Sequence, residues 1–263
     1  MRRSLLCSLA AVLALSSCDS GSEEPPESGT AITVLVTYTP GVRAAVDDVE
    51  GLVAQAFDET NAVYANSDID LRLVPVHLAG VTYAWTDDRL VDLERLLRTD
   101  DGVLDEVHTL RDRHEADLVV VVSDRPGTTV NAAVMAEAST AFVIVHWEAL
   151  GAPGYALAHE VGHLQGARHA SDEDPELAPF AYGHGFRTDS LRTIMAGGRD
   201  RRLVPVFSGP AQTSDGVVLG DSAFHDNARV LRETAVYLSN FRGPQTPTDF
   251  VPPGTWPVLP GLR

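Results

Sequence analysis

Short apolar runs and segments with helical spacing alternate along the first two thirds of the chain. In residues 47–64, apolar positions recur every three or four residues, which is the spacing of one buried face of a helix. Residues 118–122 are a continuous Leu-Val run, which is typical of a strand covered on both sides. The same patterns predict further strands at 31–37, 69–73 and 141–146, and further helices at 86–97, 100–115, 155–164 and 226–241.

The order of these elements predicts a single α/β domain. Strands and helices alternate up to residue 164, whereas residues 170–190 have the composition of a loop. The final segment, 243–263, holds six prolines and is interpreted as a tail that wraps the surface or stays mobile. We therefore expect a folded domain over residues 31–242, with a smaller C-terminal portion, followed by this Pro-rich tail.

The N-terminal segment has the features of an export signal. Two arginines follow Met1, an apolar run covers residues 5–15, and Leu-Ser-Ser-Cys ends at Cys18. This run is shorter than the roughly 20 apolar residues that a permanent membrane span needs. Leu-Ser-Ser-Cys is similar to the lipobox of bacterial lipoproteins. Residues 1–17 are therefore predicted to be a cleaved signal peptide, Cys18 a lipidated anchor, and residues 18–30 an acidic flexible tether.

Lipidation of Cys18 predicts a protein held at the bacterial cell envelope, on the extracytoplasmic side, with the membrane as a partner. The alternative is a cleaved signal with an incidental cysteine. Because Cys7 and Cys18 are the only cysteines, the folded domain is expected to have neither a disulfide nor a thiol-based latency switch. The chain has 37 acidic and 20 basic residues and no basic stripe, so nucleic acid is not an expected partner.

One motif predicts a metal site. His159-Glu160-Val161-Gly162-His163-Leu164-Gln165-Gly166-Ala167-Arg168-His169 fits the pattern H-E-x-x-H-x-x-G-x-x-H. Residues four apart lie on one face of a helix, so His159 and His163 can bind the same ion. A left-handed conformation at Gly166 would end the helix and return His169 to that ion. Three neutral imidazoles suit one Zn²⁺ and leave a fourth position open, as in catalytic sites.

Glu160 is the predicted general base of this site. A carboxylate beside a water activated by zinc can take its proton while the water attacks a carbonyl, which predicts metal-assisted hydrolysis of a protein or peptide substrate. Two alternatives are a catalytically inactive, zinc-binding surface lipoprotein and a hydrolase of non-peptide amides. The intact Glu160 argues against the first, since a binding module does not need that carboxylate. Four other histidines lack ligand spacing and are interpreted as structural: His77, His108, His114 and His146.

The histidine motif resembles that of the metzincin zinc proteases, and Thr193-Ile194-Met195-Ala196 resembles their Met-turn. Further segments, including Leu35-Val36-Thr37-Tyr38-Thr39-Pro40 and residues 179–185, are similar to bacterial peptidyl-Asp metalloendopeptidases and related reprolysin-like proteases. The resemblance implies a twisted mixed sheet, a central helix with the first two ligands, a small C-terminal subdomain, and Met195 packed beneath the metal. It also implies that the strand near residues 142–145 forms the edge to which an extended peptide adds.

Two positions depart from the family pattern, and one property of the family needs a cation. Gly197 stands where the family often has a tyrosine, and Ala170, directly after the third ligand, fits none of the acidic subfamilies. The family is named for cleavage on the amino side of Asp, which implies an arginine in the pocket that receives this side chain. Arg187 and Arg192 are the favoured candidates, with Arg168 and Arg199 considered beside them. The alternative for each is a surface arginine paired with a carboxylate.

Overall fold

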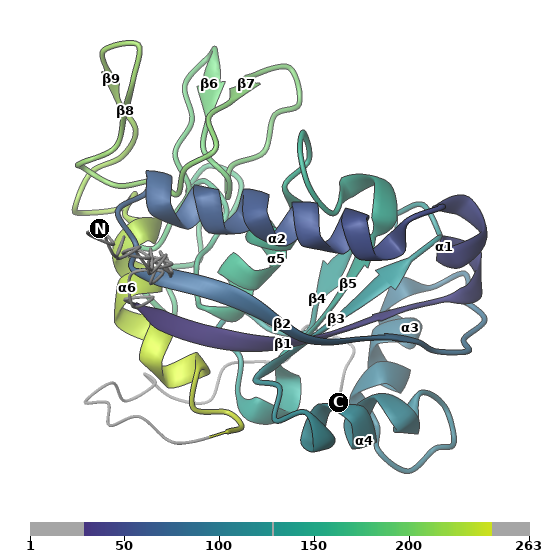
Figure 1. The fold of residues 1–263 in the computed structure, drawn as a ribbon. Helices are drawn as coiled ribbons and strands as arrows, with labels where there is room; N and C mark the ends of the chain where they lie inside the picture. Colours follow the sequence, from purple (N-terminus) through teal and green to yellow (C-terminus); the bar gives the residue numbers. More distant parts are fainter. Residues whose placement is uncertain (1–28, 128, 244–263) are drawn as a thin grey trace, which may run out of the picture.

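The computed structural model describes residues 29–127 and 129–243 (Figure 1). The predicted signal peptide 1–17, the predicted anchor Cys18, and the tether and tail other than residues 29, 30 and 243 lie outside these described residues. Within them, no helix is both long and apolar enough to cross a bilayer.

A five-stranded mixed sheet forms the centre of the fold, in the order β2-β1-β3-β5-β4. The parallel strands are rich in Val, Ile and Leu, which pack well on a pleated surface. They are β1 (Thr30–Tyr38), β2 (Leu71–Gly80), β3 (Leu118–Ser123) and β5 (Phe142–His146). Strand β4 (Val130–Asn131) runs antiparallel to β5. The predicted α/β fold class with a mixed sheet is confirmed.

The edge of the sheet differs from the expectation. The strand near residues 142–145, β5, pairs with β3 on one side and with β4 on the other, so it is an internal strand. Val130 lies opposite Ile144 and Asn131 opposite Val143, which makes β4 the edge beside β5. The prediction was wrong because a strand of two residues has no periodicity that a sequence pattern could reveal.

Helices cover both faces of the sheet (Figure 1). On one face α2 (Val49–Asn66) and α5 (Ala156–Leu164) pack with Val120 and Val122 of β3. On the other face α3 (Arg89–Leu97) and α4 (Asp105–Arg113) pack with Val119 and Val121. Alternate residues of a strand point to opposite faces, so β3 is buried along its whole length, as its continuous apolar run predicts.

Three helix starts differ from the sequence pattern, each for a local reason. Helix α1 (Pro40–Ala45) lies where the pattern predicts no helix; it begins at Pro40, and proline is favoured in the first turn of a helix. Helix α3 begins after Asp88, whose carboxylate accepts a hydrogen bond from the Leu90 amide. Helix α4 begins five residues later than expected because Leu104 has a φ of 62°, which interrupts helical geometry.

The chain after α5 is largely irregular, as predicted. It contains two small ladders and a closing helix, α6 (Asn227–Leu238), whose N-cap Asp226 accepts a hydrogen bond from the Arg229 amide. Two single 3₁₀ turns, η1 (Ala138–Thr140) and η2 (Trp147–Ala149), flank β5. The ladders pair β6 (Leu191–Arg192) with β7 (Arg202–Leu203), and β8 (Thr213–Ser214) with β9 (Val217–Val218).

Candidate metal centre

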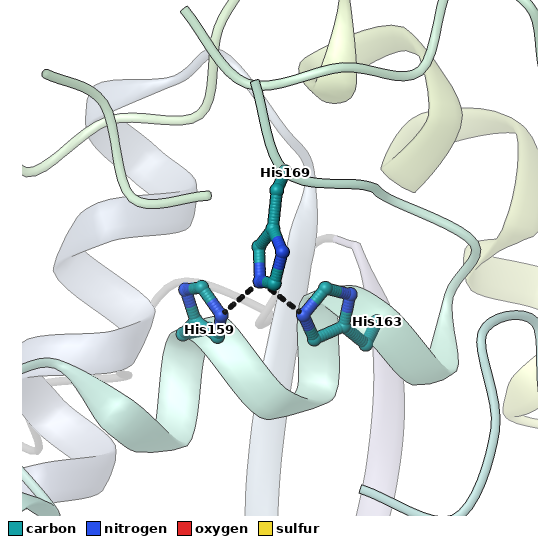
Figure 2. A group of neighbouring side chains, drawn as sticks. All are labelled: His159, His163 and His169. Carbon is teal, nitrogen blue, oxygen red and sulfur yellow. Dashed lines mark hydrogen bonds between the residues drawn. The ribbon is translucent and has the colours of Figure 1, made fainter. Parts of the chain in front are cut away.

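Helix α5 presents two histidines of the motif on one face. His159 and His163 are one turn apart, and their rings point away from the sheet toward the loop that follows the helix (Figure 2). A flank of the helix is packed so closely that a Cβ at Gly162 would lie 2.8 Å from Sδ of Met195. The close approach of Met195 therefore helps to fix the helix that carries the two imidazoles.

The turn at Gly166 brings the third histidine back to the first two. Gly166 has a φ of +100°, a conformation that is cheap only for glycine, as the sequence predicts. His169 then returns over α5, with its Nε2 atom 3.1 Å from Nε2 of His159 and 3.0 Å from Nε2 of His163 (Figure 2). Three nitrogens about 2.0–2.1 Å from one tetrahedral ion would be about 3.4 Å apart, so the observed spacing suits such an ion.

Backbone carbonyls fix the orientation of the two helical ligands. Nδ1–H of His159 donates to the carbonyl of Ile194 over 2.9 Å, and Nδ1–H of His163 donates to that of Ala167 over 2.8 Å. A carbonyl only accepts, so both Nε2 atoms carry lone pairs that face His169. A single N–H on His169 cannot satisfy both lone pairs, whereas a metal cation can. The donor set therefore fits a metal ion.

The three imidazoles are neutral at neutral pH. Burial lowers the pKa of His159 to about 4; the hydrogen bond to the Ile194 carbonyl acts in the opposite direction, and the positive charge of Arg192 acts in the same direction as burial. Burial also lowers the pKa of His163 well below its usual value and lowers that of His169. Because only a neutral imidazole can bind a metal, the site is in its metal-binding form without a change in protonation.

Glu160 lies beside the histidines in a cavity of about 380 Å³. The residue is 7 % exposed, and no hydrogen bond from another described residue reaches its carboxylate. Burial raises the pKa of Glu160 to about 8, and the positive charge of Arg89 acts in the opposite direction. The cavity brings together a carboxylate, three imidazoles and the edge strand, and its lining residues are Arg89, Leu90, Thr129, Val130, Asn131, His159, Glu160, His163 and His169.

Met195 lies in a tight turn beneath α5. The Ala196 amide donates to the Thr193 carbonyl over 3.1 Å, and Met195 is fully buried. The chain of the third ligand also passes close to this turn, because a Cβ at Gly185 would lie 2.8 Å from the carbonyl carbon of Met195. The turn thus supports both the helix and the loop that supply the ligands.

The favoured specificity residues lie in other surroundings. Arg187 forms ion pairs with Asp172, over 2.7 Å, and with Glu173. Glu173 in turn accepts a hydrogen bond from the Gly197 amide over 2.8 Å. Arg187 therefore contacts the segment after Met195 through Glu173. Arg192 donates from Nη1 to the Ala196 carbonyl over 3.1 Å. Neither arginine is among the residues that line the cavity.

The other two arginines considered also lie outside the cavity lining. Arg168 is paired with Asp174 over 2.8 Å and donates to the Ala178 carbonyl over 2.7 Å. Arg199 follows Gly198, whose φ is +100°. Arg168 and Arg187 thus fit the alternative interpretation, since each is paired with a carboxylate.

Sequence reasoning missed two residues near the site. Arg89 lines the cavity, but no motif distinguishes it, because its position depends on how α3 packs. His184 is fully buried, and its Nδ1–H donates to the carbonyl of His169 over 3.0 Å, which holds the third-ligand loop. The similarity of residues 179–185 to the peptidyl-Asp enzymes was a usable signal for His184.

Comparisons with known proteins agree with this site. The Reprolysin_5 family model, described as metallo-peptidase family M12, matches residues 28–204. A peptidyl-Asp metalloendopeptidase of Xanthomonas campestris is 38 % identical over 219 residues, which cover 80 % of this chain and 52 % of that protein. One of Stenotrophomonas maltophilia is 34 % identical over 229 residues, covering 82 % of this chain and 54 % of that protein. The chain thus spans about half the length of these curated relatives.

A solved chain described as "Structure of a chaperone-substrate complex" has the same fold. It aligns with a TM-score of 0.65 and 22 % identity, over 82 % of this chain and 36 % of that chain. Identity at this level supports the fold alone. The match of the family model to most of the chain, across the five-stranded sheet, α5 and all three histidines, carries the assignment: the chain belongs to metallo-peptidase family M12.

Proposed function

We propose that the chain is a zinc-dependent endopeptidase. The observation that carries this proposal is the convergence of the Nε2 atoms of His159, His163 and His169 in one cavity with the buried carboxylate of Glu160. Three imidazole donors with an open side suit a catalytic zinc ion. The names of the curated relatives support the same activity.

The residues of the cavity have distinct roles in this reaction. The three histidines would hold a zinc ion, which would supply Lewis-acid chemistry for a water and for the carbonyl of the bond to be cut. Burial alone favours the protonated form of Glu160, and a cation bound beside it would favour the ionised form. In that form a carboxylate oxygen of Glu160 accepts the proton of the attacking water and then delivers it to the leaving nitrogen. The Ile194 and Ala167 carbonyls keep the rings of His159 and His163 in place throughout.

An extended peptide is the substrate that suits this cavity. Val130 and Asn131 of the edge strand β4 line it together with the histidines. Addition of a peptide strand at this edge would place a backbone carbonyl beside the three imidazoles, and such pairing is largely independent of sequence.

The test uses the full chain loaded with zinc and denatured casein as substrate. Glu160→Gln is expected to keep near-stoichiometric zinc and to lose most of its activity, because the ligands remain while the base is gone. His163→Ala is expected to lose zinc as well. Glu50→Gln, an exposed residue in the first turn of α2, is the matched control and keeps full activity. A fully active Glu160→Gln enzyme would show the proposed mechanism to be wrong.

The inactive zinc-binding lipoprotein is the less favoured alternative. It predicts a wild-type protein that binds zinc and cleaves neither casein nor peptides, with or without a chelator. The intact Glu160 argues against this alternative, since a protein that only binds zinc does not need an acidic side chain buried beside the three imidazoles, where its ionised form is unfavourable.

The preferred substrate has Asp directly after the cleaved bond. The relatives' name, peptidyl-Asp metalloendopeptidase, supports this preference. Cleavage-site profiling on a peptide library measures it directly. Absence of Asp or Glu enrichment after the cut bond would contradict the preference and leave the zinc mechanism unaffected.

The location proposed for the enzyme is the bacterial cell envelope, with a lipid on Cys18 as the anchor. The sequence Leu-Ser-Ser-Cys supports this proposal. Metabolic labelling with a fatty-acid analogue should mark the wild type and not Cys18→Ser, because two or three acyl chains anchor a protein stably. A freely secreted, unlabelled wild-type protein would contradict it.

A further inference from the structure

One arginine enters the cavity of the metal centre from the far face of the sheet. Arg89 and Leu90, the first two residues of α3, line the same cavity of about 380 Å³ as Glu160 and the three histidines. Arg89 is the single arginine among the described residues that line this cavity. Its side chain is exposed, so a ligand that enters the cavity can reach it.

The guanidinium of Arg89 has no carboxylate partner, although two aspartates directly precede it. Asp87 forms an ion pair with Arg125 over 3.6 Å, and Asp88 accepts the hydrogen bond of the Leu90 amide over 2.8 Å. Among the described residues, no carboxylate oxygen lies within 4.0 Å of the Arg89 guanidinium. In a chain with 37 acidic residues, an arginine whose neighbouring carboxylates are engaged elsewhere is available for an acidic ligand.

The position of Arg89 relative to Glu160 indicates which part of a substrate it meets. Glu160 delivers a proton to the leaving nitrogen, and that nitrogen belongs to the residue after the cut bond. Arg89 lines the same cavity as Glu160, so a substrate residue whose nitrogen lies at Glu160 comes within the part of the cavity that Arg89 borders. Thr129 and the β4 residues line the cavity with them, which places Arg89 beside the edge where an extended peptide would run.

We propose that Arg89 receives the acidic side chain of the substrate residue directly after the cleaved bond. This inference rests on the proposed function and names the specificity residue of that site. A guanidinium binds a carboxylate through two parallel hydrogen bonds, and the ion pair strengthens when the bound peptide excludes water. Arg89 would thus assume the role that the sequence alone assigned to Arg187 or Arg192.

The test compares two peptides that differ only in Asp or Asn after the cleaved bond. In the wild-type enzyme kcat/KM is expected to favour Asp, and Arg89→Gln is expected to reduce this Asp/Asn ratio by about tenfold or more, mainly through the Asp peptide. Arg89→Lys should restore part of the ratio, because it keeps the charge but not the fork. Arg98→Gln is the matched control: it removes the same charge at the far end of α3, where Arg98 is paired with Glu94, and it should leave the ratio unchanged.

Charge reversal gives a second and independent readout. Arg89→Glu should lower the rate on the Asp peptide and raise it on a peptide with Arg at that position. An unchanged Asp/Asn ratio in Arg89→Gln would overturn the proposal, as would loss of the ratio in Arg192→Gln with Arg89→Gln unaffected.

Binding separates this proposal from the proposed function. In the zinc-loaded Glu160→Gln background, calorimetry should show tighter binding of the Asp peptide than of the Asn peptide, and Arg89→Gln should abolish this difference. If the wild type hydrolyses neither peptide while the binding difference persists, the endopeptidase proposal fails and the assignment of Arg89 stands. If Arg89→Gln leaves the binding difference intact, the assignment of Arg89 fails.

Discussion

Adding a single methyl group at Gly185 should lower both the stability of the protein and its affinity for zinc. In Gly185→Ala the new Cβ would lie 2.8 Å from the carbonyl carbon of Met195 and 2.9 Å from the amide nitrogen of Ala196. Both are backbone atoms of the tight turn, so no side-chain rotation relieves the overlap. Ordinary contacts between carbon atoms lie at about 3.5–4.0 Å. The turn and the third-ligand loop must therefore separate by about half an ångström or more.

Two opposing effects set the change in the free energy of unfolding of Gly185→Ala. Overpacking of this kind costs about 1–3 kcal/mol, while replacing glycine by alanine stabilises by about 0.4–1 kcal/mol through the unfolded chain. We expect a net loss of about 1–2 kcal/mol in the free energy of unfolding. The Gly185 amide donates to the Arg168 carbonyl over 2.9 Å, and Ile194, which holds the His159 ring, directly precedes Met195. Displacement of these partners should weaken zinc binding by about 10–100-fold.

Denaturant unfolding of the zinc-free protein and competition with a chromogenic zinc chelator measure the two effects. Gly80→Ala is the matched control. Its Cβ would lie 3.5 Å from the Tyr38 ring, an ordinary contact distance, and Gly80 is far in sequence from the histidine motif. The control should keep wild-type zinc affinity. If Gly185→Ala equals Gly80→Ala in both measurements, the close approach at Met195 does not support the site and the reasoning fails.

Three further predictions concern the core, pH and metal removal. Arg111→Ala should lower the free energy of unfolding, measured in urea, by about 3 kcal/mol or more. The buried guanidinium donates hydrogen bonds to the carbonyls of Ala116, Asp117 and Ala138, and the variant removes all three. The zinc-free protein should be stable above pH 6.5 and lose stability as the pH falls toward 4. His159 alone contributes up to about 1.4 kcal/mol per pH unit to this loss, because its folded pKa of about 4 means that it binds fewer protons folded than unfolded; a slope of urea midpoint against pH that is no flatter in His159→Gln would contradict this. Chelation of zinc should leave the far-UV circular dichroism unchanged and lower the thermal midpoint, because Ile194 and Ala167 hold the rings without metal; loss of helical signal on chelation would show that metal is needed for folding.

The sequence predicted the elements whose signals are local. The apolar run of β3 and the helical spacing of α2 predict both elements to within two residues of their observed bounds. The position of Gly166 likewise predicts the end of the helix that carries His159 and His163. The cluster of three histidines could be predicted for the same reason, because its spacing follows from the geometry of one helix and one turn.

The parts that sequence reasoning missed depend on tertiary packing. Strand β4 has two residues, and its pairing with β5 is set by the sheet rather than by periodicity. Arg89 reaches the cavity because α3 packs on the sheet, seventy residues before the motif. Arg187 is closer to the motif in sequence, yet Asp172 and Glu173 hold it in ion pairs that no pattern could reveal.

The shortness of β4 also bears on self-association. An exposed strand edge is a template for pairing with other chains, and long edges promote aggregation. Strand β4 offers only Val130 and Asn131 for such pairing, and its neighbour β5 is already paired on both sides. Two residues supply few backbone hydrogen bonds for pairing with another folded copy, and the net charge of −17 adds repulsion between copies. The edge can thus stay open in a concentrated solution without seeding a larger sheet.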